Sequence, residues 1–357
     1  MMSPKYIFIL MIALILIHQC LKNPNQPENN IPDSTSHNFV WEIDTLGIYG
    51  SVLSDVWIVN EDNIWVVGKI IMPDPDSSWN GTGRERFNAA HWDGGHWTFS
   101  RFERGAPLKS IWYFNENDIW ASGGVPLHWD GEKWDYYHLW NMGILDNNDG
   151  GVDHIWASSP DNIYFVGRKG SIVHYNGSDF KKIDNDNDLS INDVWGFSKN
   201  NIYFCQYESF SDASSGILHY NGQNLSQIFY SEEINYDSDS LAGVAHTIWG
   251  YQDTLYVGVS SGIWKESIKT GQGIMIPWGN IFDEVIYSNK IRGLHYNDIF
   301  VVGNKMRFAH YNGASWRDFS NIFGRIGTYE SVDITKDMVC AVGWTNNYQG
   351  IVVVGKR

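Results

Sequence analysis

Apolar positions recur along the chain in a pattern that repeats seven times. Each unit opens on a triplet whose middle residue is Val or Ile. The triplets are Asp55-Val56-Trp57, Ser110-Ile111-Trp112, His154-Ile155-Trp156, Asp193-Val194-Trp195, Thr247-Ile248-Trp249, Lys290-Ile291-Arg292 and Ser331-Val332-Asp333. Self-similarity at a nearly fixed period is the signature of repeat architectures, so the chain predicts one structural unit used seven times.

Two further motifs complete each unit. A second apolar or aromatic position follows the triplet by eight residues, or by seven in units five and seven: Trp65, Trp120, Tyr164, Tyr203, Tyr256, Phe300 and Cys340. A Val-Gly pair often comes next. Five units then carry His-Trp/Tyr-Asp/Asn-Gly, at 91–94, 128–131, 174–177, 219–222 and 310–313. Because Asn-Gly and Asp-Gly favour tight hairpins, each unit predicts four short strands, here called a to d, with the hairpin between c and d.

The number of residues fits a closed ring. The 319 residues from Phe39 to Arg357 give about 46 per unit, within the ~40–50 of known propeller blades. The seventh unit lacks strand d, and the segment Phe39–Asp44 has the pattern of the missing strand. We therefore expect an all-β, seven-bladed β-propeller over residues 39–357, built of four-stranded antiparallel blades, with the last blade closed by the N-terminal strand.

The first 38 residues predict export. Lys5 precedes the uncharged apolar run 6–17, which is shorter than the ~20 residues a membrane-spanning helix needs. A positive start and a short apolar run predict a signal peptide over residues 1–19. Cys20 follows, in a position that resembles the lipobox of bacterial lipoproteins, in which the Cys is lipidated. The Pro-rich polar residues 20–38 predict a flexible tether. The alternative is a plain signal peptide with an incidental Cys.

Composition narrows the choice of function. The chain has 25 Lys+Arg and 41 Asp+Glu, a net charge of -16, which argues against nucleic acid because the phosphate backbone needs a basic surface. Three Cys cannot build a disulfide framework. Cys205 and Cys340 fall on strand b, where we expect buried thiols. The catalytic templates for serine hydrolases, phosphate loops and zinc proteases are missing, so the balance is against an enzyme.

The blade motif resembles that of a group of bacterial secreted and lipoprotein propellers, whose blades run Asp-Val-Trp-Ala-Val-Gly … Leu-His-Tyr-Asn-Gly-x-x-Trp. The likeness covers nearly the whole chain after the tether, and it implies a propeller and export. Members of that group sometimes carry the label glucosyl transferase, but the shared residues build the blade and nothing in this sequence supports that chemistry.

The recurring aromatic and histidine residues have both functional and structural interpretations. The five triplet Trp residues, 57, 112, 156, 195 and 249, could form a sugar-binding or cofactor-binding ring. Packing between neighbouring blades is the better prediction, because stacked sheets need one bulky residue at the same place in each repeat. The five motif histidines lie on separate blades. We expect them to fix the adjacent turns rather than to bind a metal.

The loops suggest where a ligand would bind. In a four-stranded blade the b–c and d–a connections share one face, and the long connections here, 69–86, 141–151, 184–190, 206–215 and 230–242, are all of these kinds. Function tends to lie in loops on a rigid scaffold. The candidate ligand-binding residues on this face are Trp79, Tyr207, Tyr236, Asp146 and Asp149. Solvated loops with no ligand are the alternative.

One loop carries a candidate metal site. Asp184, Asp186 and Asp188 resemble the start of a calcium loop, although Leu189 stands where the usual Gly would be. Calcium is the one cofactor that the sequence suggests.

We therefore expect an exported, lipid-anchored monomer at the cell envelope, in contact with the membrane only through its anchor, or else a secreted protein. It would act as a binding or scaffold module for an envelope protein or a polysaccharide, with no nucleic-acid partner. A carbohydrate-active enzyme, either glycosidase or glycosyl transferase, is one alternative. A purely structural envelope protein is the other.

Overall fold

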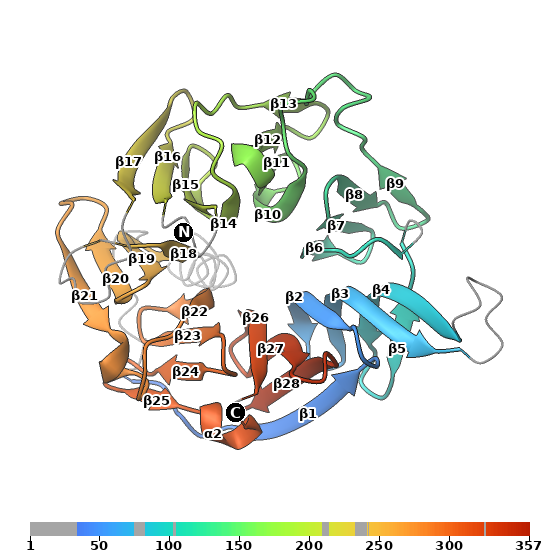
Figure 1. Ribbon diagram of the computed structural model, residues 1–357, viewed down its shortest axis with the longest axis vertical. Coiled ribbons are helices and arrows are strands. Elements are labelled where there is room, and N and C mark those ends of the chain that lie inside the picture. The colour runs from blue at the N-terminus through green and yellow to red at the C-terminus, as the bar shows by residue number, and fades with distance from the viewer. Residues whose placement is uncertain are drawn as a thin grey trace, which may run out of the picture. The chain divides into compact units, whose positions relative to one another are not determined.

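Seven four-stranded antiparallel sheets stand side by side around a central axis (Figure 1). The computed structural model describes residues 34–74, 83–102, 105–208, 214–232, 241, 243–324 and 326–357. Within it, Thr35–Arg357 form one compact unit. The chain is a seven-bladed β-propeller, as the repeat predicts. The predicted signal peptide and Cys20 lie outside the described residues.

The strands of each blade follow one another from the axis outward. The first three blades are β2 (Val52–Asn60), β3 (Asn63–Pro73), β4 (Arg84–Trp92) and β5 (Trp97–Ser100); β6 (Ser110–Asn115), β7 (Asp118–Ser122), β8 (Pro126–Trp129) and β9 (Trp134–Tyr136); and β10 (Val152–Ser159), β11 (Asn162–Gly167), β12 (Ile172–Tyr175) and β13 (Phe180–Lys182).

The next three blades are β14 (Ile191–Ser198), β15 (Asn201–Tyr207), β16 (Ser215–Tyr220) and β17 (Leu225–Ser231); β18 (Ala245–Tyr251), β19 (Thr254–Val259), β20 (Gly262–Ser267) and β21 (Gly273–Pro277); and β22 (Ser288–His295), β23 (Asp298–Gly303), β24 (Phe308–Tyr311) and β25 (Trp316–Asp318). The short helix α2 (Ser320–Phe323) follows β25, and 3-10 turns occur at Arg168–Gly170 and Trp278–Asn280.

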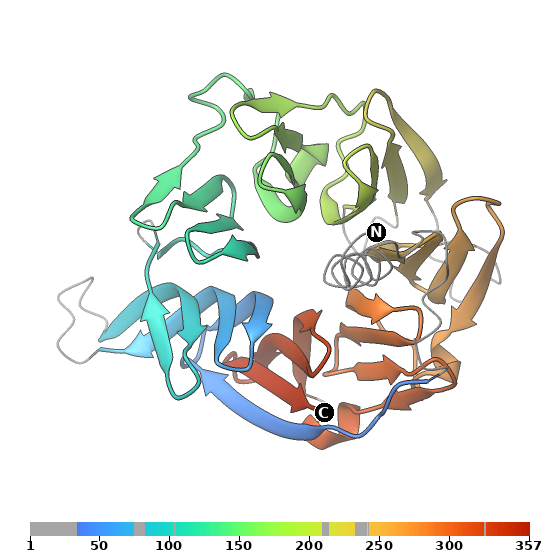
Figure 2. The ribbon, with the colours of Figure 1, turned by 180° about the vertical axis from the view of Figure 1, so that it is seen from behind.

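The seventh blade is completed by the N-terminal strand, which confirms the predicted closure. Its sheet runs β26 (Gly327–Ile334), β27 (Met338–Thr345), β28 (Gly350–Lys356) and finally β1 (Val40–Leu46). Strand β1 lies along the outer side of β28 (Figure 2), paired from Val40 opposite Lys356 to Leu46 opposite Gly350. The two ends of the propeller chain are therefore hydrogen-bonded neighbours.

The core lies between the blades rather than within them. One cluster joins Leu53 and Val56 of blade one to Val342 and Val352 of blade seven, and the other interfaces are packed in the same way. The triplet Trp residues take part: Trp156 and Trp249 are buried, and the rings of Trp57 and Trp112, on neighbouring blades, lie 4.8 Å apart. Packing between blades is therefore confirmed as the role of these residues.

Each motif histidine contacts the side chain of the first residue of strand b in the same blade. The Nε2 atoms of His91, His128, His174, His219 and His310 lie 2.7–3.0 Å from side-chain oxygens of Asn63, Asp118, Asn162, Asn201 and Asp298, respectively. These contacts tie strand c to the a–b turn, which confirms the structural interpretation. Cys205 and Cys340 are both buried, and burial raises the pKa of each thiol.

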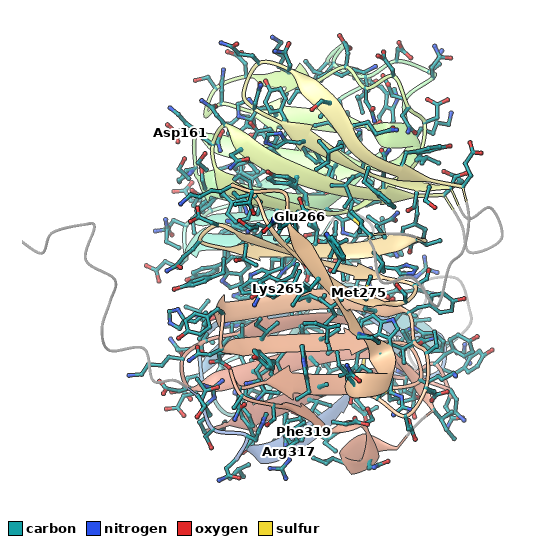
Figure 3. The ribbon with its side chains drawn as sticks, turned by 90° about the vertical axis from the view of Figure 1, so that its left-hand side faces the viewer. Asp161, Lys265, Glu266, Met275, Arg317 and Phe319 are labelled. Carbon is teal, nitrogen blue, oxygen red and sulfur yellow. The ribbon has the colours of Figure 1, made fainter. Side chains whose placement is uncertain are left out.

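The ring has two faces, seen edge-on in Figure 3. The a–b and c–d turns lie on one face, called here the turn face; Asp161, in the a–b turn of blade three, lies on it at the left of Figure 3. The b–c and d–a connections lie on the other face, called the loop face. Among the described residues, no helix has the length and apolar character needed to cross a membrane.

Closure of the ring can be tested on β1. The ring of Trp41 packs against Phe308 and Phe319, at centroid distances of 5.3 and 5.0 Å, whereas Ile43 on the same strand is 50% exposed. We expect Trp41→Ala to lower the free energy of unfolding by about 3 kcal/mol, because it leaves a cavity where the ring closes. Ile43→Ala, the matched control, should change it by less than about 0.5 kcal/mol. Urea unfolding followed by fluorescence would measure both, and equal effects would contradict this account of closure.

Candidate functional site

A β-bulge recurs at the start of the inner strand in six of the seven blades. The register between strands a and b shifts at Leu53/Asp55, Val152/His154, Ile191/Asp193, Ala245/Thr247, Ser288/Lys290 and Tyr329/Ser331. The extra residues are Ser54, Asp153, Asn192, His246, Asn289 and Glu330. A bulged residue has no partner in the ladder and its side chain is re-aimed, which is why bulges are common beside binding sites.

The Val-Gly motif on strand b makes room for these bulges. A Cβ on Gly68 would lie 2.2 Å from the backbone oxygen of Val52, and one on Gly303 would lie 2.1 Å from that of Tyr287. No side chain fits so close to the backbone, so these two positions require Gly. Blades four and five form the bulge without Gly, because Gln206 and Val259 stand in this place. Gln206 is fully buried, and its side-chain amide has no hydrogen-bond partner among the described residues.

The bulged residues line a single cavity on the axis. This axial pocket has a volume of about 270 Å³ and receives side chains from all seven blades. Its walls include the six bulged residues, Lys109 at the corresponding place in blade two, and Tyr207. Since inner strands begin at the loop face, the pocket lies at that end of the central channel. A few converging polar groups in a concave site are the usual form of a binding site.

Below the pocket, a buried ion cluster joins blades four, five and six. Asp193 is 2% exposed and lies 3.0 Å from Lys290 Nζ and 2.8 Å from Arg292 Nη2. Its Oδ2 also accepts hydrogen bonds from the Thr247 hydroxyl at 2.6 Å and from the Ile248 amide at 3.0 Å. Burial alone would raise the pKa of Asp193, but the two cations outweigh burial and hold the pKa well below its usual range.

Asp55 makes the equivalent link among blades seven, one and two. Its carboxylate accepts hydrogen bonds from the Ser331 hydroxyl at 2.6 Å, the Ser110 hydroxyl at 3.0 Å and the Ile111 amide at 3.0 Å. The first Asp of the Asp-Val-Trp triplet thus binds the backbone of the next blade. Carboxylates that accept several such bonds are strong, directional connectors.

Two carboxyl groups of the axial pocket have raised pKa values. Burial raises the pKa of Asp153 and of Glu330. Each has a donor nearby: Arg168 Nε lies 3.1 Å from Asp153, and Trp344 Nε1 donates to Glu330 at 2.7 Å. Because each carboxyl is already held by a donor, the arrangement is better suited to presenting polar groups to a ligand than to transferring protons.

The candidate ligand-binding residues proposed from the sequence do not come together at one site in the structure. Tyr207 lines the axial pocket, with its ring 5.1 Å from that of His246, and burial raises its pKa to about 12. Asp146 and Asp149 do not line the pocket. Instead, Asp149 forms an ion pair with Lys182 at 2.6 Å and accepts a hydrogen bond from the Asp146 amide at 2.7 Å. Trp79 and Tyr236 lie outside the described residues.

The candidate calcium residues lie elsewhere on the loop face. Asp184, Asp186 and Asp188 line an open hollow of about 870 Å³ that also receives Lys169 and Tyr230. In the part of the chain that the structure describes, no three His, Cys, Asp or Glu side chains gather in a way that could hold a metal ion. Calcium binding remains a prediction from the sequence alone.

Sequence reasoning missed Lys109, Asn289 and Glu330. All three lie immediately before a triplet, at a place where the residue type varies from blade to blade: in chain order the seven residues are Ser, Lys, Asp, Asn, His, Asn and Glu. A search for repeats finds the residues that stay constant from blade to blade. The signal that could have revealed the pocket is a polar position of variable residue type, two residues before the constant Val or Ile of each triplet.

Comparison with known proteins identifies the fold only. No family model and no curated protein matches the chain. Among solved structures, "YCF48 bound to D1 peptide" is 12% identical with a TM-score of 0.64, covering 93% of this chain and 99% of that one. YCF48 from Cyanidioschyzon merolae is also 12% identical, with a TM-score of 0.60 and coverages of 88% and 98%. The WD40 propeller domain of Doa1 is 12% identical, with a TM-score of 0.57 and coverages of 89% and 97%. At such identities the likeness establishes the propeller fold alone.

We expect the stability of the folded protein to depend on pH because of one carboxyl group on β26, that of Asp333. Asp333 accepts hydrogen bonds from the amides of Ile58 and Ile334, at 2.7 and 2.9 Å, and burial raises its pKa from 3.8 to about 7. Between these values the folded protein binds the proton and the unfolded chain does not. The contribution of Asp333 to the free energy of unfolding is therefore largest below pH 4. It falls by about 2–4 kcal/mol as the pH rises to 7.

Urea unfolding at several pH values would measure this effect. We expect Asp333→Asn to remove that part of the pH dependence, whereas Asp337→Asn, in the exposed turn after β26, should leave it in place. The same slope in the Asp333 variant as in the unaltered protein would contradict the assignment.

Proposed function

We propose that this protein is an exported, lipid-anchored propeller of the cell envelope that binds a short segment of a protein partner in its axial pocket. The observation that carries the proposal is the bulge. Six blades direct a bulged side chain toward the same point on the axis, and blade two adds Lys109. A fold that needed only to pack would not require these residues to be polar.

The chemistry of the pocket favours a peptide segment. Its walls combine the carboxyl groups of Asp153 and Glu330, the amides of Asn192 and Asn289, and the ammonium group of Lys109. Lys109 is exposed and forms no ion pair within the described part of the chain. Donors and acceptors of both charge signs suit a backbone with its N–H and C=O groups. A volume of about 270 Å³ accommodates one or two side chains rather than a folded surface. The solved complex of YCF48 with a D1 peptide supports a ligand of this class for a propeller.

The first residues of the propeller unit are held at the turn face. Thr35 lies against the turns of blade six: its amide donates to Asn312 O at 2.9 Å and its hydroxyl to Asn297 O at 2.9 Å. Both turns belong to the turn face, whereas the axial pocket opens toward the loop face, so these residues do not obstruct the pocket.

Lipidation can be tested directly on the full chain. A Cys20→Ser variant should lose incorporation of labelled palmitate and should move from the detergent phase to the aqueous phase in a phase-partition assay, because no acyl chain remains. Partition of this variant into detergent at the level of the unaltered protein would rule out the anchor.

Partner binding can be tested by site-specific photocrosslinking in the envelope. A photoreactive amino acid at Ser54, in the axial pocket, should yield a discrete protein adduct, whereas the same residue at Ser178, in an exposed c–d turn, should not. Lys109→Glu should reduce the Ser54 adduct at least fivefold, because it reverses the charge of the exposed ammonium group of the pocket. Lys181→Glu, a matched reversal on the exposed side of β13, should leave the adduct unchanged.

Either of two results would overturn the proposal. One is equal crosslinking from Ser54 and Ser178. The other is a Ser54 adduct that is indifferent to Lys109→Glu.

A further inference from the structure

A second cavity lies between blades one and two, away from the axis. It has a volume of about 610 Å³ and is lined chiefly by aromatic side chains, namely Trp65, Phe102, Tyr113, Trp129 and Trp134. The a–b turns of the two blades, through Asn63 and Glu116, contribute to its edge. This blade 1–2 cleft shares no residue with the axial pocket.

Trp65 is unusual among its repeat counterparts. The same strand-b position is buried in the other six blades: Trp120 is 1% exposed, Tyr164 2%, Tyr203 8%, Tyr256 3%, Phe300 0% and Cys340 0%. Trp65 is only half-buried. In this one blade, an indole ring that the repeat otherwise uses for packing is open to a cavity.

Fewer rings cover Trp65 than cover Trp120, and one difference lies in the segment that follows strand d. In blade two, Tyr137 comes after β9 and its ring stacks on Trp120 at 5.8 Å, one of five ring contacts that cover Trp120. In blade one, Phe102 comes after β5 but packs on Trp134 of blade two, at 4.2 Å. Within the described residues, Trp65 keeps a single ring contact, with His91 at 4.4 Å.

Polar groups surround the aromatic walls. Arg101, which forms an ion pair with Glu85, and Glu116 bring one charge of each sign, and Asn63 and Ser100 bring an amide and a hydroxyl. His91 Nε2 lies 3.0 Å from Asn63 Oδ1, and burial lowers the pKa of His91, so that its ring is neutral at pH 7. A ligand for this cleft needs an apolar face for the rings and uncharged hydrogen-bonding groups at its edge.

We propose that the blade 1–2 cleft binds a pyranose ring of a glycan. A pyranose presents C–H bonds on one face, which carry partial positive charge and stack on the electron-rich face of an indole. Its hydroxyl groups lie around the ring edge, where they meet the polar rim of the cleft. An aromatic peptide side chain would fill the walls but would leave the rim unsatisfied. This site is independent of the axial pocket, so the protein would hold a glycan and a protein partner at once.

Isothermal titration of the purified full chain with chitohexaose, cellohexaose and maltohexaose tests the proposal. At least one of these oligosaccharides should bind and quench tryptophan fluorescence. Trp65→Ala and Trp134→Ala should each weaken that binding at least tenfold, because each removes a stacking face. The matched control is Trp316→Ala. Trp316 occupies the same repeat position as Trp134 but in blade six, away from the cleft, and this variant should bind as the unaltered protein does.

A second variant distinguishes loss of the binding site from loss of folding. Ser100→Tyr fills the cleft without removing a core side chain, and it should abolish oligosaccharide binding while the thermal melt stays cooperative. The proposal is overturned if none of the three oligosaccharides binds, or if Trp65→Ala or Ser100→Tyr binds as tightly as the unaltered protein. It is also overturned if N-acetyltryptophanamide binds and the sugars do not, because the cleft would then be a pocket for an aromatic side chain.

Discussion

Closure of the ring is the constraint on which the rest of the structure depends. A blade cannot bury its two faces alone; each face is covered only by the next blade, so every blade needs a neighbour on both sides. The β1–β28 pairing meets this need at the last position, with Trp41 packed into the interface between blades six and seven. The axial pocket and the blade 1–2 cleft exist only because this closed ring holds their walls at fixed positions.

Buried carboxylates strengthen the ring near its axis. Asp55 joins three successive blades through hydroxyl and amide donors. Asp193 is bound to blade five through the same kinds of donor and to blade six through two cations. A buried charge is costly unless it is fully paired, and here the pairing is possible only when neighbouring blades are in register. The same residues that join the blades therefore also select one arrangement of the inner strands, and with it one shape of the axial pocket.

The fold could be predicted from the sequence because the same four-strand pattern recurs seven times. The closure could be predicted because Phe39–Asp44 matches a strand that the last blade lacks. The residues of the binding site could not be predicted in this way. Tyr207 was found because it lies in a long connection on the loop face, but Asp149 proved to be paired with Lys182, a contact that depends on where a loop meets the end of β13. Trp65 holds the same repeat position as six buried residues, and its exposure depends on how neighbouring rings such as Phe102 pack in space.

The bulge has a consequence for how such a protein can change. The bulged residue belongs to no ladder pair and is not a member of the hydrophobic clusters between the blades, so the blade core sets few requirements on its identity. Seven positions converge on one cavity, and their remaining constraints come from local partners, as where Asn289 donates to Tyr329 O and the His246 ring contacts Tyr207. The propeller thus separates two tasks that most binding sites combine, since one set of residues maintains the fold while another is free to diversify. New ligand specificities can arise by single substitutions on an unaltered scaffold.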